Sequence, residues 1–118
     1  MNEIIADKFI KLYYGHLNNH AIAQLIPHLR ECSTYVRDNV TIKGRDNIQN
    51  MLNQFGQVHF EPKQMTILVN GDRRANIMVS GIMVSGISNT KYTFCEFMHL
   101  AYGNDKNYWI HSSILQTV

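Results

Sequence analysis

The stretch "NIMVSGIMVSGIS", residues 76–88, contains the five-residue unit IMVSG twice. Its Ile and Val content predicts a β-strand, whose side chains point alternately to two faces. Because five is an odd number, the second copy presents its residues to the opposite face from the first. One face then carries Ile77, Val79 and Met83, and the other carries Met78, Ile82 and Val84. Both faces of this strand are apolar, so the second face needs a cover.

Three further long strands are predicted at residues 57–70, 91–102 and 107–118. Short turns such as Asn70-Gly71-Asp72 separate the long strands, and short turns predict antiparallel pairing. Before these strands, the spacing of apolar residues predicts helices, and two short strands are expected before the third helix. The helices are expected at 3–17, 21–29 and 46–55, and the short strands at 32–39 and 40–43. Since helices and strands are largely segregated, we predict one α+β domain over residues 1–118, with three helices packed on an antiparallel sheet.

The second apolar face of this sheet indicates a partner. Three short helices cover only one side of a four-stranded sheet. An exposed apolar patch above a few hundred Å² is unusual in a monomer. We therefore predict that a second copy of the sheet covers this face in a dimer. The alternative is a strongly curved sheet that buries part of its back against its own C-terminus.

The overall composition argues against several classes of protein. Of the 118 residues, 45% are hydrophobic and 17% are charged, which is typical of a globular domain. The formal net charge is +2 and the basic residues are scattered, so we expect no direct contact with nucleic acid. No apolar run reaches eighteen residues, so we expect no membrane span, and we expect no secretory signal.

Four phrases of the chain resemble the nuclear transport factor 2 family. They are FIKLYYGHLNN (9–19), STYVRDNVTIKGRDNI (33–48), TFCEFMHL (93–100) and YWIHSSILQ (108–116), in the family's order and over nearly the whole chain. The resemblance implies a cone-shaped α+β fold, in which a bent antiparallel sheet wraps a long helix. It also implies that the sheet pairs back to back with another such domain.

The resemblance further implies a role in transport between cytoplasm and nucleus. The pairs Phe9-Ile10 and Tyr13-Tyr14 resemble the residues at these places in the branch of the family that serves nuclear protein import. That branch binds phenylalanine-glycine repeats of nucleoporins, and some members carry the GTPase Ran in its GDP form. Asp38 falls in the turn where the family places an acidic contact to Ran. The resemblance thus implies an adaptor located in the cytoplasm, in the nucleus and at the pores of the nuclear envelope. The alternative within the family is the small subunit of a heterodimeric mRNA export receptor.

Two groups of residues are candidates for binding. Met78, Met83, Phe97 and Trp109 are expected to form the dimer face or a groove that takes phenylalanine rings. Phe9, Tyr13 and Tyr14 are expected to line the interior of the cone. For both groups the alternative is ordinary core packing.

Enzymes of the ketosteroid isomerase and dehydratase type use the same fold, with a pocket inside the cone. For such chemistry the chain offers His99, His111, Tyr13 and Asp38. The two histidines fall within apolar alternations, where a packed or half-exposed histidine is more common than a catalytic one. No glycine-rich phosphate loop and no metal-ligand spacing is present in the sequence. We therefore expect no catalysis, no cofactor and no metal.

Overall fold

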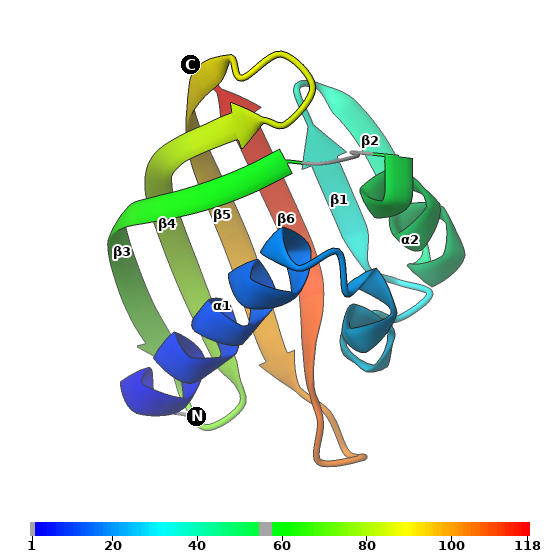
Figure 1. Cartoon of the computed structure of the whole chain (residues 1–118). Helices are drawn as coiled ribbons and strands as arrows, with labels where there is room; N and C mark the ends of the chain where they lie inside the picture. The colour runs from blue at the N-terminus through cyan, green and yellow to red at the C-terminus, as the bar shows by residue number, and fades with distance from the viewer. Residues whose placement is uncertain (1, 55–57) are drawn as a thin grey trace.

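A computed structural model describes residues 2–54 and 58–118 and shows an α+β fold with three helical segments and a six-stranded sheet. The helical segments are α1 (Glu3–Asn18), the 3-10 helix η1 (Ile22–His28) and α2 (Arg45–Gln54). The strands are β1 (Thr34–Arg37), β2 (Val40–Lys43), β3 (Val58–Asn70), β4 (Arg74–Ser85), β5 (Lys91–Tyr102) and β6 (Tyr108–Thr117). The helices lie on one side of the curled sheet (Figure 1). The predicted fold class is confirmed.

Helix α1 begins at a side-chain cap and lies across the sheet. The Oδ1 atom of Asn2 accepts a hydrogen bond from the backbone N–H of Ile5 at 3.0 Å, and Glu3 follows in the first turn, where a negative charge is favourable. Its buried stripe is Ala6, Phe9, Ile10, Tyr13, Tyr14 and Leu17. Leu12 was expected in this stripe because it lies three residues after Phe9, but it lies beside the stripe and is 48% exposed.

The segment after α1 is a 3-10 helix rather than the expected α-helix over 21–29. Pro27 lies inside it and has no backbone N–H to donate, which favours a short, tight helix over a long one. Helix α2 follows Gly44, whose positive φ of 93° suits glycine. The expected end of this helix at Phe55 and Gly56 lies outside the described residues. No helix in the described chain is long and apolar enough to cross a membrane.

The sheet has the strand order β2-β1-β6-β5-β4-β3. Strands β3 to β6 form the expected antiparallel meander, and β1 and β2 form a tight antiparallel pair. The turn between β1 and β2 is Asp38-Asn39, with φ values of 47° and 72°, which Asp and Asn tolerate better than most residues. The exception to the antiparallel pattern is that β1 runs parallel to β6.

Strands β3 and β4 both bend sharply along their length, which curls the sheet into a cone (Figure 1). The β3 register shifts between Pro62 and Gln64, and Gly81 of β4 faces this irregularity. A Cβ atom on Gly81 would lie 2.2 Å from the carbonyl oxygen of Glu61, a distance no side chain tolerates. Gly81, the glycine of the first IMVSG unit, is therefore the position at which the backbone of β3 lies too close to β4 to leave room for a side chain.

The two faces of the meander differ as the alternation predicts. Ile77, Val79 and Met83 are at most 7% exposed and belong to the core under the helices. On the opposite, outer face, one apolar residue from each of four adjacent strands falls in register. We call these four residues the outer row: Val36 of β1, Ile114 of β6, Phe97 of β5 and Met78 of β4. In the described chain the helices cover the inner face only (Figure 1).

Candidate functional site

A buried polar cluster lies inside the cone, where helix and sheet meet. Glu96 of β5 is 1% exposed and Arg37 of β1 is 8% exposed, and both point to the inner face. Four hydroxyl-bearing residues surround them. We call the six residues the inner cluster: Glu96, Arg37, Tyr13, Tyr14, Tyr35 and Ser113.

The carboxylate of Glu96 accepts hydrogen bonds on both oxygens. Arg37 Nη2 donates to Oε2 at 3.1 Å, and Tyr14 donates to Oε1 at 2.6 Å. Ser113 Oγ and the more distant Tyr13 hydroxyl, at 3.4 Å, also donate to Oε2. Among the described residues no buried side-chain nitrogen or oxygen is left without a partner. These donors fix the position of the carboxylate and occupy both of its oxygens, so a ligand that bonds to Glu96 has to displace one of them.

Burial and the neighbouring charge set the protonation states of the cluster. Burial, together with the charge of Glu96, raises the pKa of Tyr13 and of Tyr14 well above the usual value. Burial also raises the pKa of Tyr35, although Arg37 opposes this. Burial lowers the pKa of Arg37, but attraction to Glu96 and the tyrosines outweighs it, so the pKa of Arg37 is raised. The tyrosines are therefore neutral donors around an ion pair.

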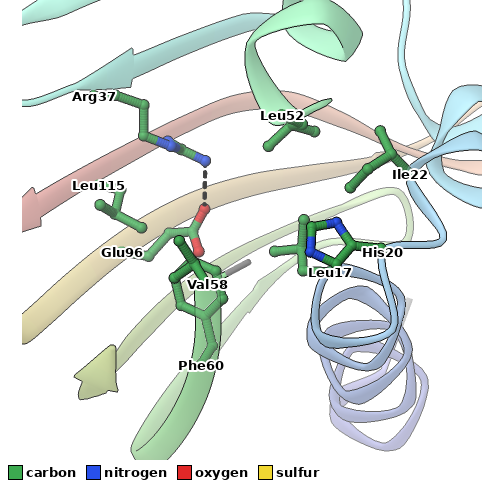
Figure 2. Close-up of a pocket in the computed structure, with 9 residues that line it drawn as sticks. All are labelled: Leu17, His20, Ile22, Arg37, Leu52, Val58, Phe60, Glu96 and Leu115. Carbon is green, nitrogen blue, oxygen red and sulfur yellow. Dashed lines mark hydrogen bonds and ion pairs between the residues drawn. The ribbon is translucent and has the colours of Figure 1, made fainter. Parts of the chain in front are cut away.

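A small cavity adjoins the ion pair (Figure 2). Its volume is about 20 Å³, enough for about one water molecule. Among the described residues it is lined by Leu17, His20, Ile22, Arg37, Leu52, Val58, Phe60, Glu96 and Leu115. Any larger ligand requires these side chains to move.

The three residues expected in the cone interior all lie there. Phe9, Tyr13 and Tyr14 are 6%, 1% and 3% exposed. Tyr13 and Tyr14 reach Glu96, whereas Phe9 packs edge-on against His28, with ring centroids 5.1 Å apart. Only the two tyrosines therefore join the polar cluster.

The four residues expected at the dimer face are split by the structure. Phe97 is 53% exposed and Met78 is 38% exposed, and both belong to the outer row. Trp109 is half-buried on the outer face, with the guanidinium of Arg30 5.9 Å from its ring centroid. The assignment of Met83 to this face is wrong, because Met83 is 7% exposed in the core.

Asp38 is exposed at the turn between β1 and β2. Its Oδ1 atom accepts hydrogen bonds from the backbone N–H of Thr117 at 3.0 Å and from the Thr117 hydroxyl at 3.2 Å. The residue therefore ties the end of β6 to the turn. Its charge remains at the surface, where a protein partner can reach it.

The residues considered for catalysis do not come together. Tyr13 lies inside the cone, whereas His99 and His111 lie on the outer face and Asp38 lies at a surface turn. The interior instead holds Glu96, which sequence reasoning did not single out. Its signal is its strand phase, which it shares with the buried Phe94 and Met98.

Comparison with known proteins places the chain in a family. The model of the nuclear transport factor 2 (NTF2) domain matches residues 5–117. The chain belongs to the nuclear transport factor 2 family. The family resemblance seen in the sequence is thereby confirmed. No curated protein sequence matches the chain.

Solved structures share the NTF2 fold at low sequence identity. Nuclear transport factor 2 from Cryptosporidium parvum has a TM-score of 0.84 and 18% identity, over 95% of this chain and 90% of that one. A chain of the yeast deubiquitinase Ubp3 and Bre5 cofactor complex has a TM-score of 0.79 and 17% identity, over 98% and 96%. A candidate scytalone dehydratase from Novosphingobium aromaticivorans has a TM-score of 0.80 and 16% identity, over 98% and 84%.

The third of these matches corrects one expectation. The sequence led us to expect that the chain is not an enzyme. An NTF2-type chain described as a dehydratase has the same fold over nearly all of this chain, so that exclusion is wrong. The match shows the fold and does not assign a reaction.

Proposed function

We propose that the chain is a nucleocytoplasmic transport adaptor that acts as a dimer and binds phenylalanine-glycine repeats of nucleoporins. The observation that carries the proposal is the outer row. Phe97, Ile114 and Met78 are 53%, 47% and 38% exposed and lie in register on adjacent strands. An apolar row of this kind, on a face that the described helices leave uncovered, suits a second sheet.

The family match supports a protein-binding role. One structural neighbour is nuclear transport factor 2 itself, and another comes from a complex of a deubiquitinase with its cofactor. The first neighbour supports a transport adaptor, and the second supports a role in a protein complex. Apolar burial of single phenylalanine rings makes each repeat contact weak, so binding gains strength from several repeats on one chain and two binding domains in one dimer.

The experiment for repeat binding compares two immobilised peptides. One carries several phenylalanine-glycine repeats, and the control replaces each phenylalanine by serine. We expect the amount of bound protein to rise steeply with the number of phenylalanine repeats and to stay at background on the serine peptide. Equal responses to both peptides would refute repeat binding.

Asp38 is the proposed contact to Ran-GDP, since its charge lies at an exposed turn. The variant Asp38→Asn removes the charge but keeps an oxygen that can accept from Thr117, and asparagine also tolerates the positive φ of 47°. We expect Asp38→Asn to weaken Ran-GDP binding, mainly through a slower association rate. An unchanged affinity in a calorimetric titration would remove Asp38 from the contact.

The alternative is a subunit of a heterodimeric mRNA export receptor. It would use the same outer row against a homologous domain instead of a second copy. Co-expression with and without such a domain distinguishes the two forms, because a heterodimeric subunit aggregates when it is produced alone.

A further inference from the structure

Strand β3 forms one edge of the sheet and lies next to helix α1 (Figure 1). A side chain already occupies the first part of this edge. The side-chain amide of Asn18 donates to the carbonyl oxygen of Phe60 at 2.9 Å and accepts from the backbone N–H of the same residue at 2.7 Å. A neighbouring strand makes the same two bonds, so Asn18 takes the place of one residue of an added strand.

The second part of the edge has backbone groups without such a partner. Along a strand, backbone groups alternate between the two sides with the same period as the side chains alternate between the two faces. Phe60 faces the inside of the cone and directs its backbone groups away from β4. Three later residues share its inward orientation and therefore direct their N–H and C=O groups the same way, namely Met65, Ile67 and Val69. In the described chain no backbone hydrogen bond outside the ladder with β4 involves these three residues.

This second part also lacks the features that usually keep sheet edges from pairing. In the first part, the register shift at Pro62 and the charge of Lys63 disfavour an added strand. Residues 65–69, with the sequence MTILV, contain no charge and no proline, and most of them favour an extended chain. We call residues 65–69 the free edge. An uncharged edge of this kind is a template for pairing with another chain.

A groove of about 590 Å³ lies between β3 and α1, beside the start of the free edge. Its apolar lining consists of Ile10, Tyr14, Pro62 and Met65. Gly15 of α1 also lines the groove, and a Cβ atom there would have no other atom within 4 Å, so open space lies beside the helix. The two lysines of the groove, Lys11 and Lys63, lie 2.8 and 3.8 Å from carboxylates on their own elements. Because each cation is paired, the groove suits an uncharged, apolar occupant.

We propose that the free edge binds an extended segment of a partner protein as an added antiparallel strand. The segment has no net charge and is apolar at every second position. Directly opposite residues of an antiparallel pair point to the same face, so the residues that bond to Met65 and Ile67 also point inward, beside α1 and toward the groove. Main-chain bonds supply the affinity, and the groove selects the apolar side chains. The free edge is separate from the outer row, so this role goes beyond the proposed transport function.

The test measures the affinity of the unaltered protein for a capped peptide of alternating threonine and valine, by NMR titration. With the valines in the groove, the valine N–H groups face β3 and the threonine N–H groups face away from it. We expect the peptide methylated on its valine nitrogens to bind at least about tenfold more weakly than the peptide methylated on its threonine nitrogens, because only the first loses hydrogen bonds to β3. Equal affinities, the reverse order, or no binding of the unmethylated peptide would overturn the proposal.

The variant Gly15→Leu tests the groove without weakening the fold, because leucine is a better helix former than glycine and its side chain extends into open space. We expect Gly15→Leu to weaken peptide binding by about tenfold or more, because its side chain takes the space of the apolar side chains of the peptide. The matched control Gly15→Ala adds only a methyl group and should retain binding. Equal affinities of the two variants would show that the peptide does not use the groove.

Amide hydrogen exchange locates the peptide on the unaltered protein. The N–H groups of Met65, Ile67 and Val69 should exchange rapidly in the free protein and slowly with the peptide, whereas those of Thr66 and Leu68, which face β4, should exchange slowly in both. Peptide-induced protection that excludes the free edge would contradict the proposal. The competing occupant is β3 of a second copy. If the unaltered chain assembled beyond a dimer and Gly15→Leu abolished that assembly, the free edge would be a self-association site and the proposal would be overturned.

Discussion

Replacing Glu96 by glutamine removes the negative charge from the inner cluster but keeps the size of the side chain. The carboxylate accepts bonds from Arg37 and Ser113 on one oxygen and from Tyr14 on the other. The amide keeps one acceptor oxygen for Arg37 and Ser113, and its NH₂ group can donate to Tyr14, whose hydroxyl also accepts. The variant therefore isolates the effect of the charge from that of packing.

The expected loss is about 3–5 kcal/mol in the free energy of unfolding, because a buried guanidinium is left without its counter-charge. Arg37 is only 8% exposed and the adjoining cavity has room for about one water molecule, so bulk water does not replace the lost counter-charge. The free energy of unfolding of a single domain is typically about 5–15 kcal/mol, so this loss would be a large part of it. The double variant Arg37→Met/Glu96→Leu removes both charges, and we expect it to be more stable than Glu96→Gln.

Urea unfolding, followed by circular dichroism and by the fluorescence of the single tryptophan, measures these values. The matched control is Asp7→Asn, which breaks the exposed pair with Lys11 at 2.8 Å and should change stability by less than about 0.5 kcal/mol. A loss below about 1 kcal/mol in Glu96→Gln would show that water reaches the ion pair. If Glu96→Gln does not fold, failure of the double variant to fold would equally refute the reasoning.

Further variants test the same core and the bend of the sheet. The three buried tyrosines have raised pKa values, so above about pH 10 they lose their protons in the unfolded chain before they do in the folded one. The free energy of unfolding should therefore fall above that pH by up to about 4 kcal/mol per pH unit. In Tyr14→Phe, which leaves two of the three tyrosines, this slope should be about a third smaller. Asn18→Ala removes two hydrogen bonds to the backbone of Phe60, at 2.9 and 2.7 Å, and should lower the free energy of unfolding by about 2 kcal/mol, whereas Asn18→Asp keeps one bond and should lose less. Gly81→Ala places a Cβ against a β3 carbonyl and should destabilise by about 3 kcal/mol, whereas Gly15→Ala, with no atom within 4 Å, should stabilise α1 by about 0.5–1 kcal/mol. Chemical unfolding checks each value, and a neutral Asn18→Ala or Gly81→Ala would contradict the contact concerned.

Local patterns were sufficient to predict most elements. The spacing of apolar residues correctly predicted α1 and α2, and the turn-forming residues correctly predicted the hairpins of the meander. Alternation also separated the two faces of β4 correctly. The assignment of Met83 to the outer face was wrong because it ignored this alternation, which places Met83 on the same side as Ile77 and Val79.

Features that depend on distant partners or on a single inserted residue could not be predicted. The parallel pairing of β1 with β6 joins segments far apart in the chain, and neither segment carries a local signal for it. The phase of Glu96 indicates burial, but its partner Arg37 is 59 residues away. In β6 the pairing passes from Ser112, opposite His99, to Ile110, opposite Leu100, so His111 is an extra residue. This insertion moves Ile114 from the inner face to the outer row, since a shift of one residue exchanges the faces of a strand.

Sedimentation velocity tests the central claim, that a second NTF2-type domain covers the outer row, most directly. The unaltered chain is expected to sediment at twice its mass of 13.7 kDa at micromolar concentration. Phe97→Lys should convert it to monomer, because it places a charge at the centre of the row, whereas Leu12→Lys, at a similarly exposed site on α1, should leave the dimer intact. A soluble unaltered chain that stays monomeric at high concentration would contradict the account.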